Sequence, residues 1–247
     1  MRTVACLNGN RRPGAHPALP ISPDQIVADA RAAVDAGATC VHVHPRDGHA
    51  EQALEPQVLT PVLRELRAAI PGAMISVTTS LAAQPDAWRR FDLVGRWAAL
   101  PDSATVNLSE PGGIEVARLL HDRRVPIEAV VTSVMGARLL AVTGIEVERI
   151  AVAPTEADVG KARSTVAQID AVLDRRLPEP PRTLHGRDQT AWPLLDDAIA
   201  AGHDIRIGLE DTLFGPDGNE AHDNAELVRA AVERTAARRV PADSNSG

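Results

Sequence analysis

The segment SPDQIVADARAAVDAGATCVHVH, residues 22–44, contains a helix followed directly by a strand. Ser22 is a favourable N-cap, Pro23 suits the first helical position, and Gly37 is a typical stop. Residues 39–44 then form a short run rich in valine, which predicts a strand. A helix that leads into a strand in this way predicts one unit of an α/β fold.

The same alternation continues along the chain. We expect strands at residues 2–7, 39–44, 73–80, 103–108, 126–132, 147–154, 182–186 and 204–211. We expect helices at residues 22–37, 55–72, 86–100, 113–123, 133–144, 155–176, 189–202 and 222–239. Pro61 and Pro193 mark a kink or a late start in two of these helices.

Eight such units in 247 residues are typical of a (β/α)8 TIM barrel. A doubly wound open sheet is disfavoured, because LNGNRRPG after the first strand lacks the glycine spacing of a dinucleotide-binding turn. We therefore predict a single (β/α)8 barrel domain over residues 1–240 and a disordered tail over residues 241–247.

The composition excludes several classes of protein. A net charge of −7 and a pI of about 5.6 argue against a nucleic acid or an anionic membrane as partner. Cys6 and Cys40 are the two cysteines, so no disulfide framework is expected, and a reducing cytoplasm fits. The N-terminal apolar run is too short for a signal peptide, and no window approaches the ~20 apolar residues of a membrane helix. We expect a cytoplasmic protein.

His42 and His44 are polar residues in a run that otherwise predicts a buried strand. Alternate side chains of a strand share a face, so the two histidines point away from Val41 and Val43. Since valines suit the helix-covered outer face, the imidazoles face the barrel axis near the end that holds active sites. Two such imidazoles can bind one metal ion, although a hydrogen-bonded core histidine beside a loop histidine remains the structural alternative.

The last predicted strand supplies charged partners for these histidines. In RIGLED, Arg206, Gly208 and Glu210 are expected to share a face, and Asp211 begins the next loop. Charges inside a barrel are costly unless they are partnered. Two imidazoles and one carboxylate are a sufficient ligand set for a catalytic divalent ion, most often zinc. The alternative is that both acids are solvated loop residues, and Cys40 is expected to be a packing residue below the histidines.

Two blocks of the sequence carry a family resemblance. HPALPISPDQIVADARAAVDAGATCVHVHPRDG, and AGHDIRIGLEDTLFGPDG followed by NAELV, resemble the β-keto acid cleavage enzymes typified by 3-keto-5-aminohexanoate cleavage enzyme. The resemblance implies a (β/α)8 barrel, a homotetramer, and a zinc site made by His42, His44 and Glu210. It also implies conversion of a β-keto acid and acetyl-CoA into acetoacetate and a new acyl-CoA.

The resemblance implies further site residues, but they match unevenly. Arg206 and Asp211 match the family's last strand, and Glu128 lines up with the glutamate of its fifth strand. The family's Ser-Thr-Gly segment falls on Thr78, Thr79 and Ser80, so that a threonine replaces the catalytic serine. The polar segment after the fourth strand retains Asn107, and the chain is shorter than most members. The family's substrate-binding glutamate after the first strand has no acidic counterpart, since that loop offers Asn10 or Arg11.

The residue types suit enolate chemistry. A metal ion with open positions can chelate a keto oxygen and a carboxylate oxygen and stabilise the enolate between them. Asp211, oriented by Arg206, is the expected base, with Glu128 the next candidate. Thr78 or Thr79 can donate to a developing oxyanion, although a merely polar strand end is an equal alternative. The enolate then attacks the acetyl thioester, and retro-Claisen cleavage completes the exchange.

Two other functions remain open, and the substrate is only partly constrained. A metal-dependent aldolase or hydrolase would share the metal site without needing acetyl-CoA, and a catalytically silent metal-binding or ligand-binding barrel would not require Asp211 and Arg206. No CoA-binding motif is evident. Because Arg11 and Arg12 would repel an ammonium group, we expect a β-keto acid with a neutral or anionic side chain, unless both arginines point to solvent.

Overall fold

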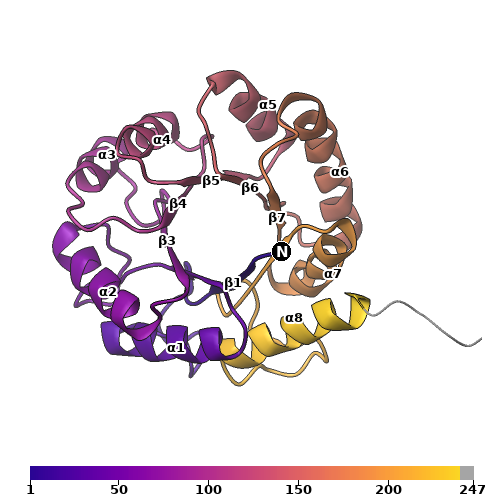
Figure 1. The fold of residues 1–247 in the computed structure, drawn as a ribbon, viewed down its shortest axis with the longest axis horizontal. Helices are drawn as coiled ribbons and strands as arrows, with labels where there is room; N and C mark the ends of the chain where they lie inside the picture. The colour runs from indigo at the N-terminus through magenta and orange to yellow at the C-terminus, as the bar shows by residue number, and fades with distance from the viewer. Residues whose placement is uncertain (240–247) are drawn as a thin grey trace, which may run out of the picture.

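The computed structural model describes residues 1–239 as a closed barrel of eight parallel strands surrounded by helices (Figure 1). The strands are β1 Thr3–Cys6, β2 Cys40–Val43, β3 Met74–Thr78, β4 Ser103–Val106, β5 Ile127–Val131, β6 Arg149–Val152, β7 Arg182–Leu184 and β8 Asp204–Ile207. Each strand pairs with the next, and β8 closes the barrel against β1. The predicted (β/α)8 barrel is confirmed. The predicted tail, residues 241–247, lies outside the described residues.

One α-helix follows each strand in the part of the chain that the structure describes. The helices are α1 Pro23–Asp35, α2 Pro56–Ala69, α3 Ala87–Gly95, α4 Gly113–Asp122, α5 Val134–Thr143, α6 Val159–Arg176, α7 Ala191–Ala201 and α8 Asn224–Arg239. None of the described helices is long and apolar enough to cross a membrane.

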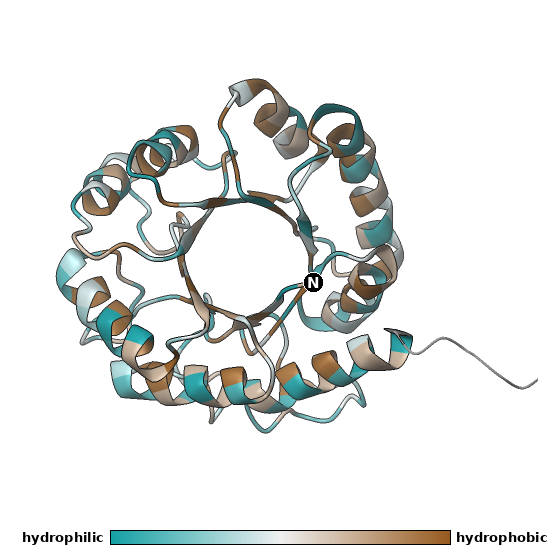
Figure 2. Ribbon diagram, viewed as in Figure 1, coloured by the Kyte–Doolittle hydropathy of each residue, from teal (hydrophilic) through white to brown (hydrophobic). Residues whose placement is uncertain are grey.

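The helix α1 shows how the local sequence produces this architecture. Ser22 and Gln25 form a reciprocal capping box that satisfies amide groups at the start of the helix. The buried face of α1 carries Ile26, Ala30 and Ala33, spaced three and four residues apart, as an amphipathic helix requires. Brown segments of the helices in Figure 2 accordingly turn toward the strands in many places.

The main hydrophobic core lies between the barrel and its helices, not inside the barrel. Val41 and Val43 are fully buried in this outer layer. Cys40 belongs instead to a small interior cluster with Val4 and Cys6. Because alternate side chains share a face, His42 also points toward the barrel interior, two residues beyond Cys40 in the direction of the C-terminal end of β2.

Two expected elements differ from the structure. The predicted strand 204–211 ends at Ile207, and a tight turn follows in which the amides of Asp211 and Thr212 donate to the Gly208 carbonyl at 2.8 and 3.0 Å. The expectation that Glu210 reaches the site by strand alternation is therefore wrong, because Glu210 lies in this turn. The predicted helix 189–202 is a short 3-10 turn, Asp188–Thr190, followed by α7, and Pro193 lies in the first turn of α7, where its missing amide hydrogen costs little.

The turn after β8 requires a glycine at position 208. A Cβ atom there would lie 2.1 Å from the carbonyl oxygen of Cys6 in β1. That carbonyl also accepts the amide of Glu210 at 3.2 Å, so the close approach of the two chains fixes the turn.

We expect Gly208→Ala to lower the free energy of unfolding by ~1–3 kcal/mol or more, as overpacking does. Chemical denaturation of both proteins measures the difference. Gly72→Ala is the matched control, since a Cβ atom at that position meets nothing within 4 Å. Equal stability of the two variants would contradict this account of the turn.

Candidate metal centre and active site

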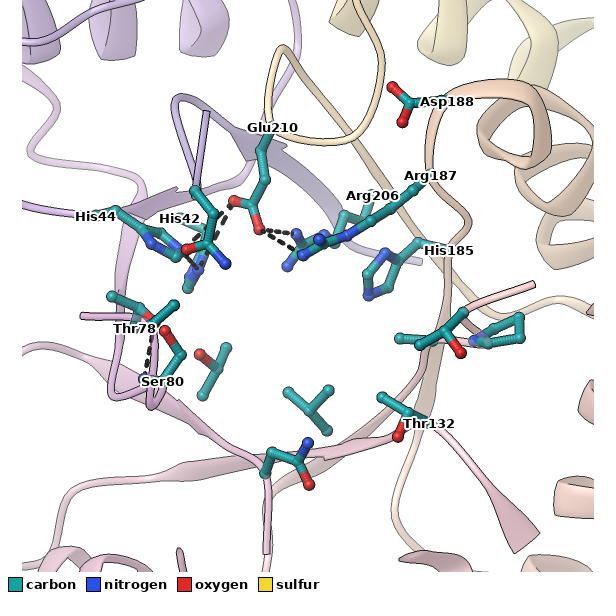
Figure 3. A pocket seen from close by; sticks show the side chains of 18 of the residues that line it. His42, His44, Thr78, Ser80, Thr132, His185, Arg187, Asp188, Arg206 and Glu210 are labelled. Carbon is teal, nitrogen blue, oxygen red and sulfur yellow. Dashed lines mark hydrogen bonds and ion pairs between the residues drawn. The ribbon is translucent and has the colours of Figure 1, made fainter. Parts of the chain in front are cut away.

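His42, His44 and Glu210 meet at the C-terminal mouth of the barrel. The two Nε2 atoms of the histidines are 3.2 Å apart, and Oε2 of Glu210 lies 3.9 Å from His42 Nε2 and 3.7 Å from His44 Nε2. All three side chains are at least 95% buried. Figure 3 shows the two imidazoles, which come from the end of β2, and the carboxylate, which comes from the turn after β8, converging on one edge of a cavity.

Partners on the far side of each ring fix the orientation of the histidines. His42 Nδ1 lies 3.0 Å from the Ser76 hydroxyl, and His44 Nδ1 lies 2.6 Å from Oε1 of Gln52. Burial lowers the pKa of His42 to about 3 and also lowers the pKa of His44. Both rings are therefore neutral at pH 7 and direct an Nε2 atom at the same point.

Glu210 has one oxygen occupied and one without a partner. Its Oε1 accepts from Arg206 Nη2 at 2.5 Å, whereas its buried Oε2 has no hydrogen-bond partner among the described residues. Burial alone would raise the pKa of Glu210, but Arg206 and the two histidines hold it well below its usual range. Gly9 makes room for this side chain, because a Cβ atom there would lie 2.2 Å from Glu210 Cγ.

These three residues fit a divalent metal ion. A buried carboxylate oxygen without a partner is costly, and a cation would satisfy it. Two nitrogen ligands held ~2.0–2.1 Å from a tetrahedral zinc ion lie roughly 3.3 Å apart, which matches the spacing of the two Nε2 atoms. The hydrogen-bonded Nδ1 atoms of both rings are the outer partners that metal-binding histidines usually have.

Arg206 and Asp211 form the second charged group of the site. Arg206 Nε lies 3.3 Å from both carboxylate oxygens of Asp211, and Arg206 Nη2 lies 3.0 Å from Oδ1. Asp211 is completely buried, and burial raises its pKa to about 6 against the opposing effect of Arg206. The same guanidinium thus binds both adjacent carboxylates.

A cavity of about 560 Å³ opens beside this cluster. The metal-site residues and Arg206 form one wall, to which the segment after β7 adds His185 and Arg187 (Figure 3). The opposite wall is formed by the ends of β5 and β6 and the loop after β6, and it includes Val130, Thr132, Ala153, Pro154 and Ala157. The loop after β6 also adds Thr155 and Glu156 to this wall, so the cavity has one strongly charged side and one side of mixed character.

Five of the expected substrate and catalytic residues line this cavity: Arg206, Thr78, Ser80, Asn107 and Asn10. The Thr78 hydroxyl accepts the amide of Ser80 at 3.1 Å, and the buried Oγ of Ser80 has no partner among the described residues. Ser80 thus has a hydroxyl free to bond a ligand.

Four other expected residues are not among those that line the cavity. The Thr79 hydroxyl donates to the Thr105 carbonyl at 2.7 Å, and Glu128 lies in the barrel interior, where it accepts from Thr183 at 3.0 Å. Arg11 binds Asp188 and the Leu209 carbonyl, and Asp211 lies behind Arg206. Arg11 is held by these contacts and does not line the cavity. The structure therefore gives no support to the expected repulsion between Arg11 and a cationic substrate.

Four further residues of the site are not among those predicted from the sequence. Ser76 pairs with His42 across β2 and β3, so its inward position in a strand is readable from the alternation. His185 and Arg187 follow β7 at the C-terminal mouth, where active-site residues concentrate. Gln52 lies in the loop after β2, and nothing in its neighbourhood in the sequence marks it.

The double variant His42→Ala/His44→Ala should lose the metal ion, because only one of the three ligands remains. Metal analysis of the purified protein should fall from about one divalent ion per chain to near zero. His121→Ala removes a half-exposed imidazole on α4 and should leave the metal content unchanged. Undiminished zinc in the double variant would refute the assignment.

Two of the solved structures that are similar to this chain illustrate how widely its fold is shared. ObcA, in its ternary complex with a C4-CoA adduct and oxalate, superposes with a TM-score of 0.72 at 16% identity over 90% of this chain. This chain spans about 64% of the length of ObcA. The native KDPGal structure superposes with a TM-score of 0.60 at 16% identity, covering 96% of this chain and 95% of that one. At these identities the likeness shows a common fold.

Comparison of sequences identifies the family. No curated protein sequence matches the chain. The sequence model described as beta-keto acid cleavage enzyme matches residues 3–135 and 110–244, which together span nearly the whole chain. The two matched regions contain His42, His44 and Glu210, so the resemblance noted in the sequence is confirmed. The chain belongs to the β-keto acid cleavage enzyme family.

Proposed function

We propose that this protein is a zinc-dependent β-keto acid cleavage enzyme that converts a β-keto acid and acetyl-CoA into acetoacetate and an acyl-CoA. The observation that carries the proposal is the buried His42–His44–Glu210 cluster, with an unpartnered carboxylate oxygen, beside the Arg206–Asp211 pair. Membership of the family supports the same reaction. ObcA has also been solved with oxaloacetate, which is a β-keto acid.

His42, His44 and Glu210 would hold the divalent ion, and Arg206 would keep Glu210 oriented toward it. When bound, such an ion stabilises the negative charge of an enolate by drawing electron density from the keto and carboxylate oxygens of a substrate. Because the histidines are neutral, the charges of the divalent ion and Arg206 would exceed those of Glu210 and Asp211. The loaded site would therefore be net positive and would favour an anionic ligand.

The chain's own residues then serve proton transfer and charge stabilisation. Asp211, held by Arg206, takes part in removal of the proton between the two carbonyl groups. The free hydroxyl of Ser80, supported by Thr78, donates a hydrogen bond to an oxyanion that develops in the cavity. The enolate carbon attacks the acetyl thioester, which forms a new carbon–carbon bond and expels the CoA thiolate. The thiolate then attacks the substrate's own keto carbon and cleaves the original bond between that carbon and the α-carbon, which gives acetoacetate and the acyl-CoA.

The reaction is tested with purified, metal-loaded protein, acetyl-CoA and a panel of β-keto acids. The proposal expects acetoacetate and acyl-CoA in equal amounts, and no acetoacetate when acetyl-CoA is omitted. Cleavage that proceeds without acetyl-CoA would instead indicate an aldolase or hydrolase. A metal-loaded protein that binds these acids without turning any of them over would be a silent binding barrel.

The variant Asp211→Asn should keep its metal and its fold but lose ~10²–10⁴-fold in kcat, the usual contribution of a general base. The amide preserves the shape of the buried side chain while removing its charge. Asp122→Asn, an exposed position on α4, serves as the control and should keep full activity. A kcat near that of the wild type in Asp211→Asn would exclude Asp211 from proton removal.

We propose in addition that the enzyme is a homotetramer, as the family resemblance implies. The molar mass in solution, measured by light scattering, should be about four times that of the 26.2 kDa chain. A monomer at micromolar concentration would contradict this.

A further inference from the structure

Arg187 is a charged residue of the cavity wall to which the proposed reaction assigns no role. It lies in the segment after β7, lines the cavity, and has a side chain that is 56% exposed. Figure 3 shows this side chain extending along the edge of the cavity toward Arg206. Among the described residues, the guanidinium makes no hydrogen bond, and its Nη2 comes no closer to a carboxylate than 4.0 Å from Oε1 of Glu210. Its donors are therefore available to a ligand.

The backbone at Arg187 is fixed by its neighbours. The Thr190 hydroxyl accepts from the Arg187 amide and donates to the Arg187 carbonyl, both at 2.9 Å. The next residue, Asp188, has a φ of 47°, which is uncommon for a residue other than glycine, and its amide donates to the Asp211 carbonyl at 2.6 Å. Backbone strain of this kind is found mostly at functional sites. The turn thus determines the point from which the Arg187 side chain reaches the cavity.

The carboxylates nearest to Arg187 are already paired with other arginines. Asp188 accepts from Arg11 Nη2 at 2.5 Å. Oε1 of Glu210 accepts from Arg206 Nη2 at 2.5 Å, so Arg187 is a second cation beside an acid that already has one. The positive charge of Arg187 is therefore in excess on this wall, and an anionic group of a ligand would offset it.

The position of Arg187 indicates which group of the substrate it meets. Oε2 of Glu210 lies on the side of the two histidines, where the ion would hold the keto oxygen and the carboxylate next to it. Arg187 approaches Oε1, the other oxygen of Glu210. A group held by Arg187 is therefore separate from the metal-bound end of the substrate.

The opposite wall of the cavity disfavours an anionic group. It carries Glu156, whose Oε1 accepts from the Thr165 hydroxyl at 2.5 Å. This hydrogen bond lowers the pKa of Glu156, so the carboxyl group is charged at neutral pH. An anionic group of a substrate would be repelled there and attracted to Arg187.

We propose that Arg187 binds a second carboxylate of the substrate, so that the preferred β-keto acid is a dicarboxylic acid. This inference deepens the proposed function and rests on it. A planar guanidinium pairs with a carboxylate through two parallel hydrogen bonds, which gives the pair a defined geometry. The neutral or anionic side chain expected from the sequence is thereby narrowed to an anionic one, with attraction by Arg187 in place of repulsion by Arg11.

Two matched pairs of ligands test the inference. 3-Oxohexanedioate carries a terminal carboxylate, and 3-oxohexanoate carries a methyl group in its place. Acetoacetate and acetoacetamide differ at the carboxylate expected on the metal ion. The affinity of the metal-loaded protein for each compound is measured by calorimetry in the absence of acetyl-CoA, so that the result does not depend on turnover.

The wild type should bind 3-oxohexanedioate more tightly than 3-oxohexanoate. Arg187→Gln should weaken binding of the diacid by ~10–100-fold, the usual worth of a hydrogen bond to a charged group, and should leave 3-oxohexanoate and the metal content unchanged. Arg187→Lys should bind the diacid with intermediate affinity, because an ammonium keeps the charge but not the two parallel donors. The control Arg64→Gln, which removes an exposed guanidinium on α2, should bind all four compounds as the wild type does.

A merely structural role of Arg187 would weaken both members of a pair equally, and that result would overturn the inference. A loss confined to acetoacetate relative to acetoacetamide would also overturn it, since Arg187 would then hold the carboxylate at the metal ion. If Arg187→Gln loses its metal, the same comparison on Arg187→Lys decides. Selective binding of the diacid through Arg187, without turnover of any β-keto acid in the presence of acetyl-CoA, would instead overturn the proposed function and leave this carboxylate site standing.

Discussion

The ion pairs of Arg206 are the interaction on which the site depends. This buried guanidinium, in β8, contacts Glu210 and Asp211, two adjacent carboxylates in the turn that follows its own strand. Without it, two negative charges would lie side by side in a buried wall. Breaking a buried ion pair by removing one partner costs ~3–5 kcal/mol. Arg206 thus allows a metal-binding carboxylate and a proton-transfer carboxylate to be neighbours in sequence and in space.

The separation of two cores makes such a polar site possible. Aliphatic side chains between strands and helices provide the bulk of the apolar burial, and they include Val41 and Val43 from the strand that carries the histidines. The barrel interior is freed for polar groups, such as the buried ion pair of Arg149 with Asp204 and the hydrogen bond between Glu128 and Thr183. One strand therefore serves stability with one face and chemistry with the other.

Backbone packing at the first loop is a further constraint on the metal cluster. Asn8 is fully buried. Its Oδ1 accepts a hydrogen bond from the His44 amide, and its Nδ2 donates to the carbonyls of His44 and Pro20. Gly9, with φ of 50°, leaves the space that Glu210 fills. The loop after β1 thus positions ligands from β2 and from the turn after β8 at once.

The fold was predictable from local pattern, whereas the site was predictable only in part. Capped helices alternating with short strands admit few architectures, and the period of two in β2 gave the correct face for His42. Strand alternation correctly places Glu210 in the site but for the wrong reason. The strand β8 ends at Ile207, and the turn that begins at Gly208 brings the carboxylate inward. The positions of Arg11 and Thr79 depend on partners remote in sequence, Asp188 and Thr105, which no local pattern specifies.

The central claim is that His42, His44 and Glu210 bind one divalent ion, and a crystal of zinc-loaded protein tests it most directly. Anomalous difference maps from data collected on the two sides of the zinc absorption edge would locate the ion without reference to activity. The account predicts one strong peak at the mouth of the barrel, within ~2.0–2.2 Å of the two Nε2 atoms and Oε2 of Glu210. A zinc-loaded crystal with no peak there, or with zinc only on surface residues, would contradict it.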